Sequence, residues 1–145
     1  MVAPDDDAVT IDIRAAVEPA IAWSFWVEPD RLTSWMGRSA DIDARPGGEI
    51  RVDYGHAIVM RGTFVELDAP VNLAFTWGWE DPAEPVRPGS SLVTVAFLSD
   101  GDGTLMQLRH TGLPDDAERA SHLEGWELFR PRLIEALQAE APPAI

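Results

Sequence analysis

The sequence contains neither cysteine nor lysine among its 145 residues. Without cysteine, disulfide bonds, thiol catalysis and metal sites with thiolate ligands are excluded. The basic residues are 11 scattered arginines against 25 acidic residues, which gives a formal net charge of −14. A chain this acidic is repelled by nucleic acid and by anionic membrane surfaces. We therefore expect neither of them as a partner.

Long apolar segments are also missing. No apolar run approaches the roughly 20 residues of a transmembrane helix, and the acidic residues 1–7 lack the apolar stretch of a signal peptide. These features predict a cytoplasmic protein with a flexible acidic tail at residues 1–7. Hydrophobic residues, which make up 46% of the chain and include six tryptophans, are sufficient for the core of one domain, placed at residues 8–140.

The longest periodic segment, residues 115–140, predicts a helix with one broad apolar face. Two residues interrupt its pattern. Gly125 disfavours a helix by about 1 kcal/mol relative to alanine, so we expect it to pack closely against a neighbour. Pro131 removes a backbone donor and is expected to kink the helix.

The residues before this helix alternate between apolar and polar in segments typical of half-buried strands. These segments are 9–15, 50–54, 58–67, 71–77, 92–98 and 104–111, with a shorter extended segment at 39–44. Two short helices are predicted after the first strand, and Gly62 suggests a bulge. The predicted fold is α+β, with a curved antiparallel sheet of six to seven strands around the long C-terminal helix.

The concave face of this sheet is the natural position for the helix, and any volume that the helix leaves unfilled becomes a pocket. The candidate lining residues are Trp35, Tyr54, Met60, Phe75, Trp77, Met106, Leu108, His110, His122 and Trp126. Plain core packing is the alternative for the apolar members. The Tyr54 hydroxyl either orients a ligand or is satisfied inside the core.

Three residues are candidates for acid–base chemistry: Glu66, His110 and His122. A histidine in an apolar pocket can act as an acid or base near neutral pH, and a buried Glu66 would be a general base with a raised pKa. We favour structural roles instead, with the histidines holding the helix start to the last strand and Glu66 in an ion pair. No third ligand is spaced to join the histidines in a metal site, so neither a metal nor a cofactor is expected.

Several short motifs, in this order and spacing, resemble a known family. They are Ala22-Trp23, residues 28–32, Trp35, residues 45–48, 62–66, 73–77, 103–104 and 110–113, His122, Gly125-Trp126 and Leu133. The set resembles the AHSA1-type branch (activator of Hsp90 ATPase homologue-like) of the SRPBCC superfamily, also called START-like or Bet v 1-like. The resemblance covers about residues 9–137 and implies a helix-grip fold with a hydrophobic cavity between the sheet and the last helix.

The resemblance implies that a small hydrophobic ligand, whose identity the sequence does not reveal, binds in that cavity. The alternatives are an enzyme of the cyclase or hydrolase kind in the same cavity, or a stress- or chaperone-related protein-interaction module. An Hsp90-type chaperone is not expected as a partner, because the sequence lacks the second domain of the co-chaperone that names the branch. A homodimer formed through an exposed aromatic strand edge is a further expectation.

Overall fold

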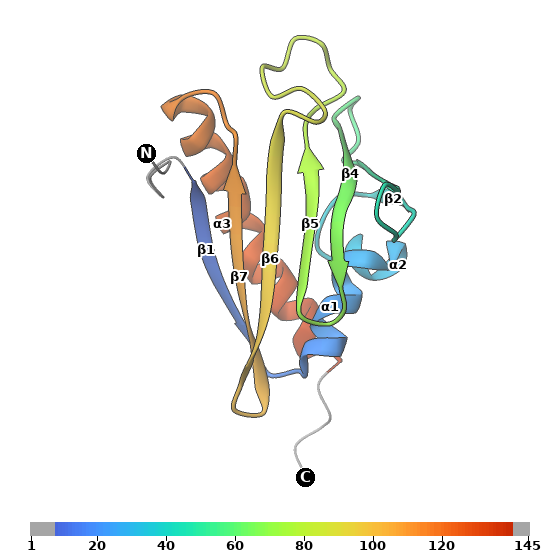
Figure 1. Cartoon of the computed structure of the whole chain (residues 1–145), viewed down its shortest axis with the longest axis vertical. Coiled ribbons are helices and arrows are strands. Elements are labelled where there is room, and N and C mark those ends of the chain that lie inside the picture. The colour runs from blue at the N-terminus through green and yellow to red at the C-terminus, as the bar shows by residue number, and fades with distance from the viewer. Residues whose placement is uncertain (1–7, 141–145) are drawn as a thin grey trace.

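The structure is a computed structural model and describes residues 8–140, so the predicted acidic tail at residues 1–7 lies outside the described residues. Within this range the chain forms a sheet, two short helices and one long helix (Figure 1). The strands are β1 (Val9–Ala15), β2 (Ser39–Ile42), β3 (Glu49–Asp53), β4 (Val59–Asp68), β5 (Asn72–Trp77), β6 (Ser91–Asp100) and β7 (Gly103–Thr111). The helices are α1 (Pro19–Val27), α2 (Pro29–Leu32) and α3 (Asp116–Gln138).

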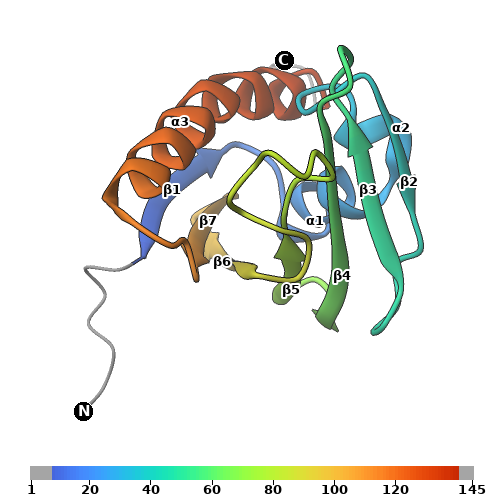
Figure 2. The ribbon, with the colours of Figure 1, turned by 90° about the horizontal axis from the view of Figure 1, so that it is seen from above.

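All neighbouring strands are antiparallel and follow the order β1-β7-β6-β5-β4-β3-β2. The first strand, β1, lies at one edge of the sheet and pairs with the last strand, β7. Val9 lies opposite His110, and Ala15 lies opposite Thr104. Seen from above, the sheet curves and α3 arches along its open side (Figure 2). The predicted α+β helix-grip architecture is confirmed.

Local chemistry explains where α3 begins. The Asp115 side chain accepts a hydrogen bond from the backbone N–H of Glu118 at 2.8 Å, which satisfies one free donor of the first turn. Asp116 and Glu118 place negative charge at the positive end of the helix dipole. The helix continues through Pro131, which is exposed, as one element. Its buried residues face the sheet and are His122, Trp126, Leu133 and Leu137.

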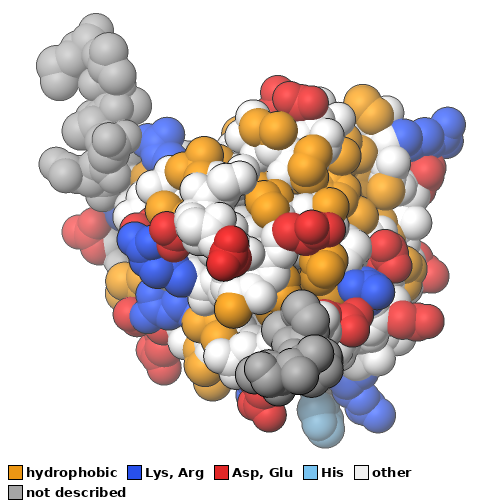
Figure 3. Space-filling model, turned by 90° about the horizontal axis from the view of Figure 1, so that it is seen from below, with side chains coloured by type: hydrophobic (Ala, Val, Ile, Leu, Met, Phe, Trp, Pro, Cys, Tyr) orange, Lys and Arg blue, Asp and Glu red, His pale blue; other side chains and the backbone are white. Residues whose placement is uncertain are grey.

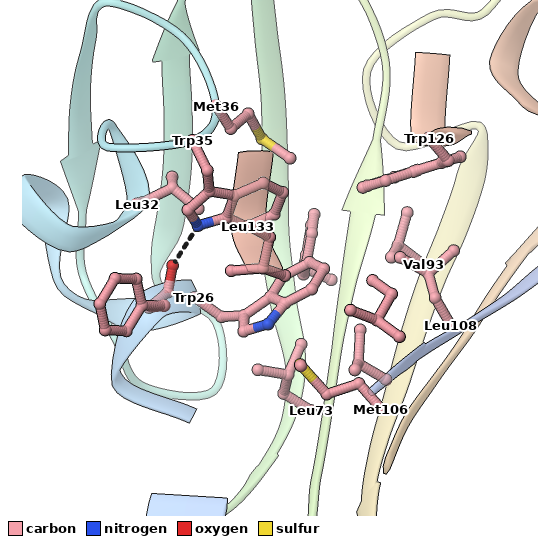
Figure 4. Packing of buried hydrophobic residues seen from close by; sticks show 14 of the residues in the cluster. Trp26, Leu32, Trp35, Met36, Leu73, Val93, Met106, Leu108, Trp126 and Leu133 are labelled. Atoms are coloured by element: carbon pink, nitrogen blue, oxygen red, sulfur yellow. Dashed lines mark hydrogen bonds between the residues drawn. The ribbon is translucent and has the colours of Figure 1, made fainter. Parts of the chain in front are cut away.

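The core fills the space between sheet and helices, as Figure 4 shows. Trp26 of α1 meets Trp35 edge-on with ring centroids 4.8 Å apart. The Trp35 indole N–H donates to the backbone oxygen of Phe25 at 2.9 Å, which satisfies a polar group that burial would otherwise make costly. Leu133 from α3 is fully buried in the same cluster. The lower end of the molecule shows hydrophobic and acidic side chains interspersed (Figure 3).

The predicted bulge at Gly62 is wrong in position. Gly62 pairs in register with Ile50, and the register shift in β4 lies between Phe64 and Glu66. A Cβ atom on Gly62 would lie 1.8 Å from the backbone oxygen of Thr76. Glycine is therefore needed there because the backbones of β4 and the end of β5 approach closely.

Candidate functional site

One end of the fold contains a cavity of about 330 Å³. Three segments surround it: the β3–β4 turn, the end of β5 with the loop that follows, and the first half of α3. This end faces the viewer in Figure 2, where the β5–β6 loop lies between α3 and strands β3 and β4. The lining residues are Tyr54, Ala57, Ile58, Val59, Trp77, Trp79, Asp81, Glu84, Glu118, Ser121, His122, Gly125, Trp126 and Phe129.

The alternation of β5 extends past the end of the strand and places two tryptophans in the wall. Trp77 faces inward, and Trp79, two residues later, forms an isolated bridge with Met60 of β4. The next residue, Glu80, donates its backbone N–H to Val59 at 2.9 Å. Its carboxylate accepts a 2.9 Å hydrogen bond from Arg51, which lowers the pKa of Glu80. These bonds hold the start of the loop against β3 and β4.

Aromatic rings from all three segments form the wall. Tyr54 lies edge-on to Trp79 at 5.6 Å and 6.0 Å from Phe129, while Trp77 and Trp126 are 5.1 Å apart between centroids. Two polar atoms of this wall are buried and have no hydrogen-bond partner among the described residues, namely the Tyr54 hydroxyl and the Trp77 indole nitrogen. Such atoms are uncommon in folded proteins and require an explanation.

His110 lies behind the wall, fully buried, in a chain of hydrogen bonds that runs from Trp126 to the backbone of Trp77. The Trp126 indole N–H donates to its Nδ1 at 3.1 Å, and its Nε2 lies 2.9 Å from Oγ of Ser91. The Ser91 hydroxyl donates to the backbone oxygen of Trp77 at 2.7 Å. Because Nδ1 accepts, Nε2 carries the proton and donates to Ser91.

This environment keeps His110 neutral. Burial, together with the nearby His122, lowers its pKa from 6.5 to about 3. The ring is 0% exposed and is absent from the described lining of the cavity, so it does not meet a ligand there. The geometry therefore fits the structural role, in which His110 of β7 is tied to Trp126 of α3.

His122, in contrast, reaches the cavity. It is 8% exposed and lines the wall next to Trp79. Its Nε2 accepts the Trp79 indole N–H at 3.2 Å, so its Nδ1 carries the proton and donates to the backbone oxygen of Glu118 at 2.8 Å. The ring of His122 is 5.3 Å from that of His110, in an edge-on contact. Of the three predicted acid–base residues, His122 is the one that the structure places in the cavity wall.

Glu66 lies elsewhere. It is exposed, and its cross-strand partner is Ala74 on β5. It borders a second, more open hollow on the outer face of the sheet together with Thr94 and Arg109. The interpretation of Glu66 as a buried general base in the cavity is therefore wrong.

The remaining predicted lining residues divide into wall and core. Tyr54, Trp77 and Trp126 line the cavity along with His122. The others are buried beside or below it and belong to the core: Trp35, Met60, Phe75, Met106 and Leu108.

Sequence reasoning missed Trp79 and Phe129, although each had a recognisable signal. Trp79 follows Trp77 at strand spacing, and Phe129 follows Trp126 at helical spacing. Gly125 was misinterpreted: apart from its chain neighbours and its own helix backbone, a Cβ atom there would have no heavy atom within 4 Å, and the residue borders the cavity. The missing side chain leaves open space and does not allow a close contact.

Within residues 8–140, no group of three or more His, Asp or Glu side chains is arranged to hold a metal ion. The same range contains no helix that is both long and apolar enough to cross a membrane.

Comparison with known proteins gives a consistent result. The family model described as activator of Hsp90 ATPase homolog 1-like protein matches residues 16–138. The solution structure of an AHSA1-like protein from Rhizobium etli is 36% identical, with a TM-score of 0.72, and the match covers 94% of this chain and 85% of that one. Among curated proteins, no match to this chain was found.

Two more distant structures share the fold. A protein from Mesorhizobium loti is 19% identical with a TM-score of 0.81, over 91% of this chain and 97% of that one. An HSP90 activator from Plasmodium falciparum is 23% identical with a TM-score of 0.74, over 91% and 96%. Because the family model spans most of the sequence and the fold agrees with it, the chain belongs to the activator of Hsp90 ATPase homolog 1-like family.

Proposed function

We propose that this protein binds a small, largely apolar molecule in the cavity between α3 and the sheet. The observation that carries the proposal is a cavity lined by aromatic side chains. Gly125 on α3 has no side chain, which leaves that part of the cavity unfilled. Ligand pockets typically measure about 300–1,000 Å³ and combine apolar walls with a few polar groups. Ser121 and His122, which line the cavity on α3, are polar groups of this kind.

The neutral fluorescent probe N-phenyl-1-naphthylamine tests this proposal. Phe129 lines the cavity, whereas its neighbour Leu128 is 55% exposed on the same helix. We expect Phe129→Ala to weaken probe binding about ten-fold, through loss of aromatic contact, and Leu128→Ala to change it less than two-fold. Circular dichroism establishes that both variants are folded. Equal effects of the two substitutions, or no probe binding to the unmodified protein, would contradict the proposal.

A second candidate function, acid–base chemistry on the bound molecule, is supported by the position of His122. Its Nδ1 is held by the backbone oxygen of Glu118 in an orienting hydrogen bond, and its Nε2 becomes available to a ligand once the Trp79 indole N–H moves away. This is the arrangement of an oriented base. If a reaction is found, His122→Gln should abolish it while the probe still binds. Full activity in that variant would exclude the mechanism.

The third candidate is the interaction role that the family description suggests. Similarity to the Plasmodium HSP90 activator is at the level of fold, at 23% identity. An ATPase assay of an Hsp90-type chaperone, titrated with this protein, tests the role directly. A rise in ATPase rate would support it, and an unchanged rate at saturating concentration would exclude it.

A further inference from the structure

The mouth of the cavity is acidic. Asp81 and Glu84 come from the loop after β5, and Glu118 comes from the first turn of α3. Among the described residues that line the cavity there is no arginine. Arg87, in the same loop, donates to the backbone oxygens of Trp79 and Asp81 and is not part of the lining. The described lining therefore carries three carboxylates against one histidine.

Glu118 extends this charge toward the interior. Its side chain is 20% exposed, and its carboxylate lies 3.7 Å from Nδ1 of His122. A partly buried carboxylate interacts with an opposite charge more strongly than one in bulk water does. The protonated Nδ1 of His122 instead donates to the backbone oxygen of Glu118, at 2.8 Å.

The aromatic wall next to these carboxylates suits the same kind of ligand. Tyr54 packs against Trp79 and Phe129, with ring centroids 5.6 and 6.0 Å apart, and all three residues line the cavity. Faces of aromatic rings attract cations, most strongly where water is excluded. The hydroxyl of Tyr54 is buried without a hydrogen-bond partner among the described residues, and burial raises its pKa, so this side chain adds no negative charge of its own.

We propose that the ligand is an organic cation, an amine or quaternary ammonium that carries an apolar group. The apolar group fills the space beside Gly125 and Trp126, and the charge lies near Glu118 and the tyrosine–tryptophan wall. This inference rests on the proposed ligand-binding function and adds the chemical class. An anion of the same size would meet three carboxylates, and the described lining has no arginine to pair with it.

The test uses two probes of nearly identical shape, phenyltrimethylammonium and tert-butylbenzene, in competition with N-phenyl-1-naphthylamine at low salt. We expect the cation to bind about ten-fold more tightly than its neutral counterpart. The advantage should shrink as ionic strength rises, because salt screens the carboxylates. Neutral binding that equals or exceeds cation binding would overturn the inference and leave the proposed function standing. Failure of all three probes to bind would overturn both.

Two charge-neutralising variants locate the effect. Glu118→Gln removes a carboxylate from the cavity, whereas Glu127→Gln removes an exposed one from the same helix outside the cavity. We expect the first to weaken cation binding about five-fold without changing tert-butylbenzene binding, and the second to change both less than two-fold. Equal losses in the two variants would show that overall charge, and not this site, attracts the cation.

Discussion

The indole N–H of Trp79 donates a hydrogen bond to Nε2 of His122 at 3.2 Å and so joins the loop after β5 to helix α3 across the cavity. A second tryptophan–histidine pair, Trp126 and His110, lies directly behind it, but there the indole meets Nδ1. The two histidines are thus held by the same donor type on opposite nitrogens. His110 is fully buried, whereas His122 is 8% exposed and lines the cavity.

The first prediction concerns the tautomers. His110 should carry its proton on Nε2 and His122 on Nδ1 in the neutral protein, because in each ring the other nitrogen accepts an indole N–H. Nitrogen-15 chemical shifts with long-range proton couplings distinguish the two forms. Finding the same neutral tautomer at both positions would contradict the hydrogen-bond arrangement described above.

The second prediction concerns pH. Since the folded-state pKa of His110, about 3, lies below 6.5, the unfolded chain takes up a proton between these values that the folded chain does not. The free energy of unfolding therefore falls as pH is lowered through this window. Each pH unit corresponds to about 1.4 kcal/mol, so the contribution lost between pH 7 and 4.5 is about 2–3 kcal/mol.

Urea denaturation at these two pH values checks this, with His110→Gln as the comparison. The variant lacks the titrating group, so its stability should fall less on acidification than that of the unmodified protein. The Asp and Glu residues contribute equally to the pH dependence of unfolding in both proteins. An equal fall in both would show that His110 does not titrate on unfolding.

The third prediction concerns Ser91, which links His110 to the backbone oxygen of Trp77. Ser91→Ala should destabilise the fold by about 1–3 kcal/mol, because it leaves buried polar groups without a partner. Ser90→Ala is the matched control, since Ser90 is exposed, and should change stability by less than about 0.5 kcal/mol. Similar urea midpoints for the two variants would disprove the role of this chain of bonds.

The fourth prediction uses Gly125 to separate stability from binding. Gly125→Ala adds one methyl group into open space and improves helix propensity, so it should stabilise the protein by up to about 1 kcal/mol. Gly125→Leu should also fold, but its larger side chain occupies the cavity and should weaken N-phenyl-1-naphthylamine about ten-fold or more. Unchanged probe affinity in a folded Gly125→Leu variant would place the ligand elsewhere.

Periodicity in the sequence was sufficient to predict most of the fold. Alternation in 9–15, 71–77 and 104–111 marks strands that the structure contains at nearly the same bounds. Glu66 was misplaced because that alternation fails locally. Val65 and Glu66 are both exposed, because the register of β4 shifts between Phe64 and Glu66. The bulge had been expected earlier in the strand, at Gly62. A bulge turns the following side chain to the other face, and hydrophobic pattern alone does not locate it.

The division between wall and core was also beyond sequence reasoning. Trp77 and Leu108 both point to the concave side, but only Trp77 lies at the end of the sheet that α3 leaves partly uncovered. That position depends on how the helix crosses the sheet and on the loop after β5, which are tertiary features. The meaning of Gly125 depends on them too, because a helical glycine borders either a close neighbour or open space.

The most direct test of ligand binding in this cavity is a titration followed through the indole N–H signals of the six tryptophans. With N-phenyl-1-naphthylamine, the signals of Trp77, Trp79 and Trp126 should shift together and saturate. Trp23, which packs on Phe97 outside the cavity, should remain unchanged as an internal control. If the three wall signals stay fixed at saturating probe, or Trp23 moves as much as they do, the cavity is not the binding site.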